Sequence, residues 1–302
     1  MKIIRCLSVF LLVITLSGCK EIRKTQENDK KELSAEDIHE VLILLKKADT
    51  DTRKNYVEKI KNMGASAINP LISELSSDDA EIQESAAALL GIIGDSTAFV
   101  PLINGLQGGI KRKYIVPWAL AKLHDSRAIP HLIKTLGNND PEVRIYTIKA
   151  LISFGYEAIN PLLEAIKSQD PFVRAGAVTA LGDIAGSEAF NPIVSLVNDK
   201  NEDVLLAVSH VMGKIGSDLA IEPLVKFLKH KNKNIRINAV RSLGIIGNIG
   251  YRNKNILENV LIDDNEMEVR ELTARVLENI TGTKYKYKND KGEMVFPKNI
   301  DK

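Results

Sequence analysis

Proline recurs along this chain at a nearly constant spacing, and each of these prolines opens a similar apolar phrase. Successive prolines lie 29 or 31 residues apart, and the phrases read PLISEL, PLINGL, PHLIKTL, PLLEAI, PIVSLV and PLVKFL. A fixed period of roughly 20–50 residues is typical of stacked repeats, in which each unit covers the apolar face of its neighbour. The chain is therefore expected to form a solenoid. The prolines are Pro70, Pro101, Pro130, Pro161, Pro192 and Pro223.

A second recurring phrase precedes the proline phrase and predicts a first helix in each repeat. Residues 170–186 read DPFVRAGAVTALGDIAG, and related stretches are DPEVRIYTIKALISFG at 140–155 and EMEVRELTARVL at 266–277. In the first of these, Val173, Ala177 and Leu181 fall on one helical stripe. Glycines late in the phrase are expected to end this helix, because glycine favours a left-handed C-cap. They are Gly91, Gly94, Gly182, Gly186, Gly213, Gly216, Gly244 and Gly247.

The proline phrase predicts the second helix. Proline suits the first helical position, where its missing N–H would have no partner, and asparagine before it suits an N-cap. We therefore expect the second helices to begin at the prolines, with Asn69, Asn160 and Asn191 as N-caps.

The pattern D-x-x-V-R, A-x-x-A-L-G-x-x-G, P-L-(I/V)-x-x-L resembles HEAT repeats of the short type named after phycobilisome lyases, over roughly residues 50–282. The resemblance implies an all-α fold, a right-handed, armadillo-type α-solenoid of about seven helix pairs. It also implies that the second helices line the concave side. We expect the solenoid to span residues 34–283, with a capping helix at 34–48 that begins at Ser34, and a hairpin or extended tail at 284–302 that covers the last repeat.

The N-terminus has the features of an export signal. Lys2 and Arg5 precede an apolar run at residues 6–15, which is too short to span a bilayer. The following residues, LSGC, resemble the lipobox of bacterial lipoproteins. This resemblance implies a signal peptide at 1–18, a lipid on Cys19 and a polar tether at 19–33. The alternative is an ordinary signal peptide with an incidental cysteine.

If the lipobox functions, the protein is lipid-anchored in the bacterial cell envelope. Lys20 after the cysteine favours the outer membrane over the inner one, and the leaflet stays open.

Charge and residue usage exclude several functions. The chain has 41 basic and 39 acidic residues, so removing Lys2 and Arg5 leaves it neutral and gives no field that would attract nucleic acid. Its two cysteines, Cys6 and Cys19, lie in or next to the signal, and the five histidines show no metal-ligand spacing. We therefore expect no metal, no cofactor and no enzymatic activity.

A pair of charges four residues apart recurs at the start of the first helices. Asp140 with Arg144 and Asp170 with Arg174 are examples, and Arg236 and Arg270 hold the arginine position in later repeats. An active site is built once, whereas this pair recurs, so we interpret it as structural. Aspartate is expected to cap its helix while arginine reaches the turn or the next repeat's aspartate. Gln83 and Leu205 depart from the pattern.

Two basic stretches are candidate partner-binding surfaces. The irregular third repeat, from Gly108, carries Lys111, Arg112, Lys113 and Trp118, with Pro117 expected to kink or shorten its helix. The alternative, which we favour, is that the break serves curvature alone. Further cations, including Lys134, Lys226 and Lys229, belong to the second helices, where they form either a solvated helix end or a patch for an acidic partner or lipid head group.

Two functional hypotheses follow. The first is a membrane-anchored, non-catalytic scaffold that binds a protein partner in the envelope, because the repeats contain no singular site. The alternative is a lyase-like or small-ligand protein that holds a tetrapyrrole-type molecule, which rests on the name of the repeat alone.

Overall fold

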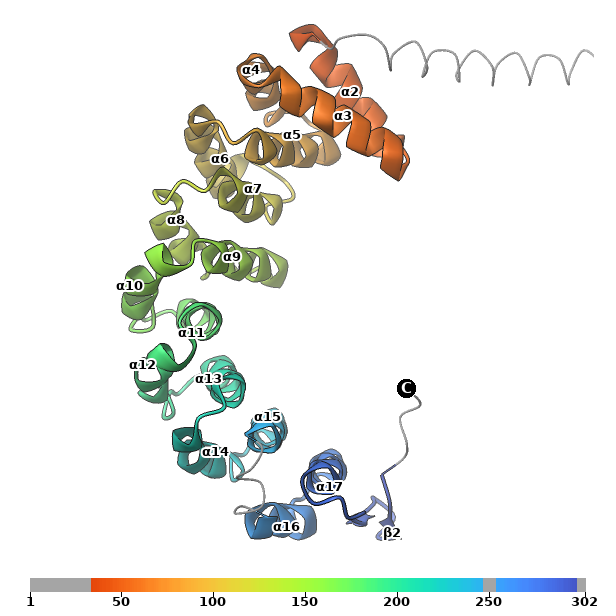
Figure 1. Cartoon of the computed structure of the whole chain (residues 1–302), viewed down its shortest axis with the longest axis vertical. Coiled ribbons are helices and arrows are strands. Elements are labelled where there is room, and N and C mark those ends of the chain that lie inside the picture. Colours follow the sequence, from red (N-terminus) through yellow and green to blue (C-terminus); the bar gives the residue numbers. More distant parts are fainter. Residues whose placement is uncertain (1–33, 247–253, 298–302) are drawn as a thin grey trace, which may run out of the picture.

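The computed structural model describes residues 34–246 and 254–297, and it shows an α-solenoid that curves into an open arc (Figure 1). The all-α solenoid expected from the period is therefore confirmed. The predicted signal peptide, Cys19 and the tether lie outside the described residues.

Two layers of helices run along the arc (Figure 1). A 3-10 turn, Ala35–Asp37, leads into α2 (Ile38–Lys47) and α3 (Thr50–Met63) at the N-terminal end. The inner layer is α5 (Ala80–Ile93), α7 (Ile115–Leu123), α9 (Pro141–Ser153), α11 (Pro171–Ile184), α13 (Glu202–Ile215), α15 (Lys233–Ile245) and α17 (Met267–Thr281). The outer layer is α4 (Ala65–Glu74), α6 (Phe99–Asn104), α8 (Ala128–Thr135), α10 (Tyr156–Ala165), α12 (Phe190–Val194), α14 (Ile221–Phe227) and α16 (Lys254–Asp263).

The placement of the layers corrects one expectation. The second helices were expected on the concave side. Instead, the second helices, which contain the prolines, line the convex side, and the first helices of the repeats line the concave side (Figure 1). Exposed polar residues of the proline helices, Lys134 among them, therefore belong to the outer layer. A single repeat does not specify the sign of this curvature, because it depends on how neighbouring repeats pack.

The second helices do not begin at the prolines, so that prediction is wrong. Pro101, Pro130, Pro192 and Pro223 are the third residues of their helices, and Pro70 and Pro161 lie deeper, inside α4 and α10. The first four N–H groups of a helix have no partner within it, so proline at the third position forfeits no bond. Asn69 and Asn160 are consequently helical residues and not N-caps, and Asn191 lies inside α12.

The N-caps of the inner helices follow the sequence prediction. Asp170 accepts a hydrogen bond from the N–H of Phe172 at 2.8 Å, and Asp140 accepts one from Glu142 at 2.8 Å. Asp79, Asn201 and Asn232 do the same in their repeats, which satisfies N–H groups that the helix leaves open. The N-cap residues of α7 and α17, Tyr114 and Glu266, make no side-chain capping bond.

The glycines of the inner helices divide into two groups. Gly94 and Gly216 are left-handed C-caps, as predicted, with φ of 76° and 70°. Gly182 and Gly213 lie inside their helices instead, where an added Cβ would fall 2.4 Å from the side chain of the next inner helix. These glycines allow close packing of neighbouring repeats and do not end the helix. Gly247 lies outside the described residues.

The chain ends in the expected hairpin, in which β1 (Tyr287–Lys288) pairs with β2 (Met294–Val295) in antiparallel register. Tyr287 is buried, and the hairpin packs on α17, where it covers the last repeat. Helices of the described ranges are all too short or too polar to cross a membrane.

Candidate functional site

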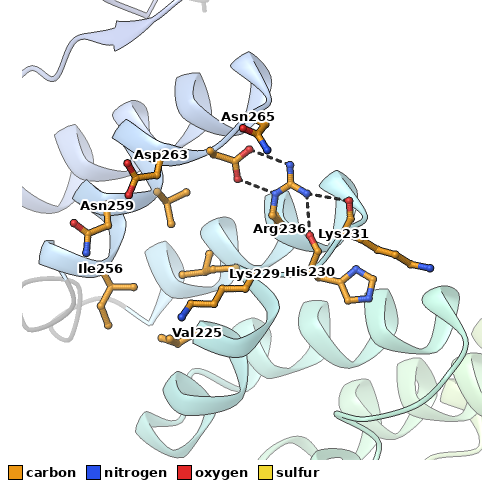
Figure 2. A pocket seen from close by; sticks show the side chains of 12 residues that line it. Val225, Lys229, His230, Lys231, Arg236, Ile256, Asn259, Asp263 and Asn265 are labelled. Atoms are coloured by element: carbon orange, nitrogen blue, oxygen red, sulfur yellow. Dashed lines mark hydrogen bonds and ion pairs between the residues drawn. The ribbon is translucent and has the colours of Figure 1, made fainter.

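A pocket of about 550 Å³ opens near the C-terminal end of the arc, between consecutive repeats (Figure 2). One side is the turn that joins α14 to α15, and the other is α16 with the turn that follows it. Val225, Leu228, Ile256 and Val260 supply its apolar floor. Its volume lies in the range of small-molecule sites, roughly 300–1,000 Å³.

One wall of the pocket is held rigidly by Arg236. Its Nε and Nη2 donate to the carboxylate of Asp264 at 2.7 and 2.9 Å, across the boundary between repeats. Its Nη1 donates to the carbonyls of His230 and Lys231 at 2.9 and 3.1 Å. Both members of the ion pair are largely buried, and together they join the two turns that form this wall.

Four polar side chains of the pocket make no hydrogen bond or ion pair within residues 34–246 and 254–297: Lys229, Asn259, Asp263 and Asn265. Figure 2 shows the Lys229 side chain extending between Val225 and Ile256. The side chains of His230 and Lys231 point to the opposite side of the turn. The pocket thus offers a cation, two amides and a carboxylate above an apolar surface.

The predicted basic surfaces do not form one patch. Lys229 lines the pocket, whereas Lys226 lies outside it on α14 and pairs with Glu222 at 3.6 Å. Lys134 is exposed at the end of α8, and residues 111–118 belong to an earlier repeat. Asn259 and Asp263 were not predicted as site residues, because the repeat they occupy lacks the proline and has no distinctive motif.

The basic residues of the third repeat hold it against the second. Arg112 donates to Glu84 at 2.6 Å, and Lys111 donates to the carbonyl of Asp78 at 2.5 Å. Tyr114 donates to Glu84 at 2.9 Å, and burial together with this carboxylate raises the pKa of Tyr114. Lys111 and Arg112 are therefore engaged within the solenoid.

The irregular third repeat also has the shortened helix that Pro117 predicts. Helix α7 has 9 residues, against 14 in α5, and Pro117 is its third residue. Trp118 is half-buried on this helix, with the Lys122 ammonium 5.5 Å from its ring centroid. Lys113 is half-buried in the turn before this helix.

Gln83 replaces the arginine between the second and third repeats. Its buried amide donates to the carbonyls of Leu75 and Gly109 at 3.1 Å each, and accepts from the N–H of Lys111 at 3.0 Å. A neutral side chain thus joins the two repeats where the charged residue is absent.

The recurring arginines connect turns within and between repeats. Arg144 donates to the carbonyl of Asn138 at 2.7 Å and lies 4.3 Å from the ring centroid of Phe172. Arg270 donates to the carbonyl of Lys288 in the hairpin at 2.8 Å. These contacts of Arg144 and Arg270 are structural.

A smaller pocket, of about 370 Å³, lies between α3, α5 and α7. Lys46 pairs with Asp79 and Glu81, Arg112 pairs with Glu84, and Arg53 donates to the carbonyl of Leu45 at 3.0 Å. Groups of three or more side chains suited to a metal ion are absent from the described part of the chain.

Comparison with known families finds HEAT repeats at residues 129–209, 159–234 and 190–278, and a PBS lyase HEAT-like repeat at 118–138. The phycocyanobilin lyase subunit alpha of Picosynechococcus sp. is 28% identical over 148 residues, which are 44% of this chain and 55% of the relative. The chain therefore spans about half the length of this relative.

The chain also resembles several solved structures in fold. The complex of CpcE and CpcF of phycocyanin lyase from Nostoc sp. PCC7120 matches with 23% identity and a TM-score of 0.46, over 50% of this chain and 99% of that one. Yeast importin-beta matches with 15% identity and a TM-score of 0.54, over 77% of this chain and 39% of its own. The importin likeness shows the solenoid fold alone.

The expectation that the chain has no enzymatic activity is corrected by these findings. The Picosynechococcus relative is named as a lyase subunit, and residues 118–138 of this chain match a repeat named after the PBS lyases. The prediction rested on the absence of a recognisable catalytic motif from the sequence, and such an absence does not decide activity.

Proposed function

Since this chain carries HEAT repeats and resembles a phycocyanobilin lyase subunit, we propose that it is a lyase-type protein that binds an open-chain tetrapyrrole. The similarity to the lyase subunit is the observation that carries this proposal.

The pocket beside Lys229 has the chemistry that such a ligand requires. An open-chain tetrapyrrole combines apolar rings with carboxylate side chains and pyrrole N–H groups. The floor around Val225 and Ile256 would pack against the rings. Lys229 would bind a carboxylate, and Asp263 would accept from the pyrrole N–H groups, since charge-assisted hydrogen bonds are the stronger ones.

Spectroscopic titration with phycocyanobilin tests this function. We expect the absorbance of the tetrapyrrole to change on binding, and Lys229→Ala to weaken the binding roughly tenfold, because a hydrogen bond to a charged group is worth about 1.5–3 kcal/mol. Asp263→Asn should weaken it by a similar factor. Lys226→Ala is the matched control, since Lys226 lies on the same segment outside the pocket.

An unchanged spectrum over the whole titration would refute tetrapyrrole binding. Equal weakening by Lys226→Ala would instead move the ligand away from this pocket. Lys229, Asn259 and Asp263 are exposed, so these variants should fold normally.

The proposal includes a protein partner, because the relative is named as one subunit of a lyase. Cross-linking in an envelope extract, with the purified chain as bait, should capture one defined protein. Capture that does not increase when phycocyanobilin is added would count against a shared reaction.

We also propose that the protein is lipid-anchored at Cys19 in the bacterial envelope, on the strength of the lipobox-like LSGC. Two or more acyl chains give stable anchoring where one gives marginal binding. Metabolic labelling with palmitate should mark the wild type and be lost in Cys19→Ala. Labelling that survives this substitution would exclude the anchor.

A further inference from the structure

The hairpin at the C-terminal end of the solenoid exposes cations and apolar side chains on the same side. Its ladder pairs Lys288 with Met294, and the Lys286 ammonium lies 5.1 Å from the ring centroid of Phe296. Met294 is 59% exposed and Phe296 is 48% exposed, and both lysines are exposed. Lys284, two residues before Lys286, is exposed as well. We call the surface formed by these five residues the outer hairpin face.

The opposite side of the hairpin is already covered by the solenoid. Tyr287 is buried, and Tyr285 and Val295 pack against the core. Successive side chains of a strand point to opposite faces, so this packing turns the lysines and the exposed apolar pair outward. The hairpin follows α17, at the far end of the arc from α2 (Figure 1).

The cations of the hairpin are not neutralised by acidic side chains. Within residues 34–246 and 254–297, Lys284, Lys286, Lys288 and Lys291 form no ion pair, whereas many lysines of the repeats do. Residues 284–297 hold these four lysines against two acidic residues, at 290 and 293, which gives a formal charge of +2. An excess of positive charge therefore surrounds the exposed apolar pair.

We propose that the outer hairpin face docks on the surface of an anionic lipid bilayer. Protein segments that bind at a membrane surface place apolar and aromatic side chains at the boundary between headgroups and acyl chains, and basic side chains beside anionic lipids. Met294 and Phe296 enter this boundary, while the lysines keep their ammonium groups among the headgroups at the ends of long apolar stems.

The residue types of this face favour a lipid surface over an acidic protein. Protein interfaces are enriched in arginine and depleted in lysine, and the planar guanidinium binds a carboxylate at two points in a fixed geometry. Residues 284–297 contain four lysines and no arginine. A lysine ammonium is a compact charge on a flexible stem, which suits headgroups that move within the bilayer.

This surface goes beyond the proposed tetrapyrrole function and is separate from its pocket. The pocket is formed by the turns at residues 228–231 and 263–265 together with parts of α14 and α16, whereas the outer hairpin face lies within residues 284–296. All variants for the test carry Cys19→Ala, so that no acyl chain contributes and residues 1–33 are the same in each. Phycocyanobilin titration scores the pocket separately and should give the same result in every variant.

Co-sedimentation of the purified full chain with vesicles of phosphatidylcholine and phosphatidylglycerol in equal parts measures the docking. Lys284→Ala with Lys288→Ala should lower the partition coefficient about 25-fold, because each lysine at an anionic surface contributes about fivefold. Lys134→Ala with Lys200→Ala is the matched control, since it removes the same charge from two exposed lysines of the repeats, and it should leave the partition coefficient unchanged. The preference for these vesicles over pure phosphatidylcholine should shrink as the salt concentration rises.

The apolar pair gives a second, independent measurement. Met294→Ser with Phe296→Ser should lower the partition coefficient about tenfold, because it removes the side chains that leave water. Trp118 is the only tryptophan of the chain, so Trp118→Phe with Phe296→Trp reports on the hairpin alone. Its emission should shift to the blue when anionic vesicles are added. Thermal unfolding of all variants should match the wild type, because the hairpin residues replaced are exposed.

Three outcomes would overturn the proposal. The first is equal partitioning of the hairpin lysine variant and its matched control. The second is an unchanged emission spectrum of the Phe296→Trp variant in anionic vesicles. The third is binding of soluble polyglutamate that Lys284→Ala with Lys288→Ala abolishes, while vesicle binding does not depend on these lysines, which would assign the face to an acidic protein.

Discussion

Arg174 of α11 donates two hydrogen bonds to Asp199 in the next repeat, from Nε at 2.8 Å and from Nη2 at 2.9 Å. Its Nη1 donates to the carbonyls of Ser168 and Gln169, in the turn before its own helix, at 2.7 and 3.0 Å. One guanidinium therefore joins the turns of two successive repeats. Arg236 and Asp264 form the same arrangement beside the pocket.

The ion pair of Asp199 predicts a loss of stability in acid. Burial by itself would raise the pKa of Asp199, but hydrogen bonds from Arg174 and from the N–H of Asn201 lower it overall. A folded-state pKa below the unfolded value means that the ionised group stabilises the fold above about pH 3.9, and that this contribution disappears as the pH falls through the folded pKa.

Asp199→Asn should reduce the free energy of unfolding at neutral pH by about 2 kcal/mol and flatten its decline in acid. Urea unfolding at several pH values measures both effects. Asp203→Asn is the control, because Asp203 is exposed, and it should keep the wild-type slope. An Asp199→Asn protein as stable and as acid-sensitive as the wild type would contradict the prediction.

Gly182→Ala should destabilise the solenoid although alanine is the better helix former. An added Cβ would meet the Cγ1 of Val211 at 2.4 Å, and overpacking costs about 1–3 kcal/mol, against a gain of about 1 kcal/mol from helix propensity. Thermal unfolding with Gly108→Ala as a control would measure this, since nothing lies within 4 Å of that position.

Val211→Ala should restore part of the stability of Gly182→Ala, because it removes the methyl groups that the new Cβ meets. If the two substitutions are simply additive, the contact between these helices is not the cause.

Gln83→Leu should cost at least about 2 kcal/mol, because it leaves the carbonyls of Leu75 and Gly109 and the N–H of Lys111 without this partner. Chemical denaturation measures the loss. Gln169→Leu, at an exposed glutamine, should stay within about 0.5 kcal/mol of the wild type. If Gln83→Leu left the free energy of unfolding unchanged, water would have to replace the amide at this boundary.

Tyr287→Ala should destabilise the C-terminal repeat by about 3–5 kcal/mol, because it removes a buried aromatic ring from beneath the hairpin. Tyr156→Ala is the matched control, since Tyr156 is 82% exposed. Calorimetry that finds both variants equally stable would refute a capping role for the hairpin.

Alkaline pH should also act on the hairpin. Burial, with a further contribution from Glu271, raises the pKa of Tyr287, so the neutral phenol stabilises the fold below the ordinary tyrosine pKa of about 10. This contribution is lost as the pH rises through the folded pKa. Tyr287→Phe should show a weaker decline in stability above about pH 10 than the wild type.

Features that depend on neighbouring residues were predictable. Asp170 caps its helix, and Val173, Ala177 and Leu181 are buried. Both features were predictable because capping and helical periodicity depend on residues close together in the sequence. Repetition then identified the solenoid, since each repeat must cover the apolar face of another. The shortened α7 followed in the same way from Pro117.

Features that depend on the approach of separate repeats were not predictable. Gly182 reads as a helix end in sequence, and only the 2.4 Å approach to Val211 shows that it admits the next helix. Lys229 and Asp263 belong to different repeats, so no local sequence pattern predicts that they line the same pocket.

Helical periodicity, the length of the repeat and the arginines that join successive repeats can be recognised in the sequence, because each is a local preference repeated many times. Which helices face the hollow of the arc, and that Lys229 and Asp263 line one pocket, are decided by the folded chain (Figures 1 and 2). Curvature is the sum of small rotations between packed repeats, and those rotations are set by contacts between side chains that are distant in the chain.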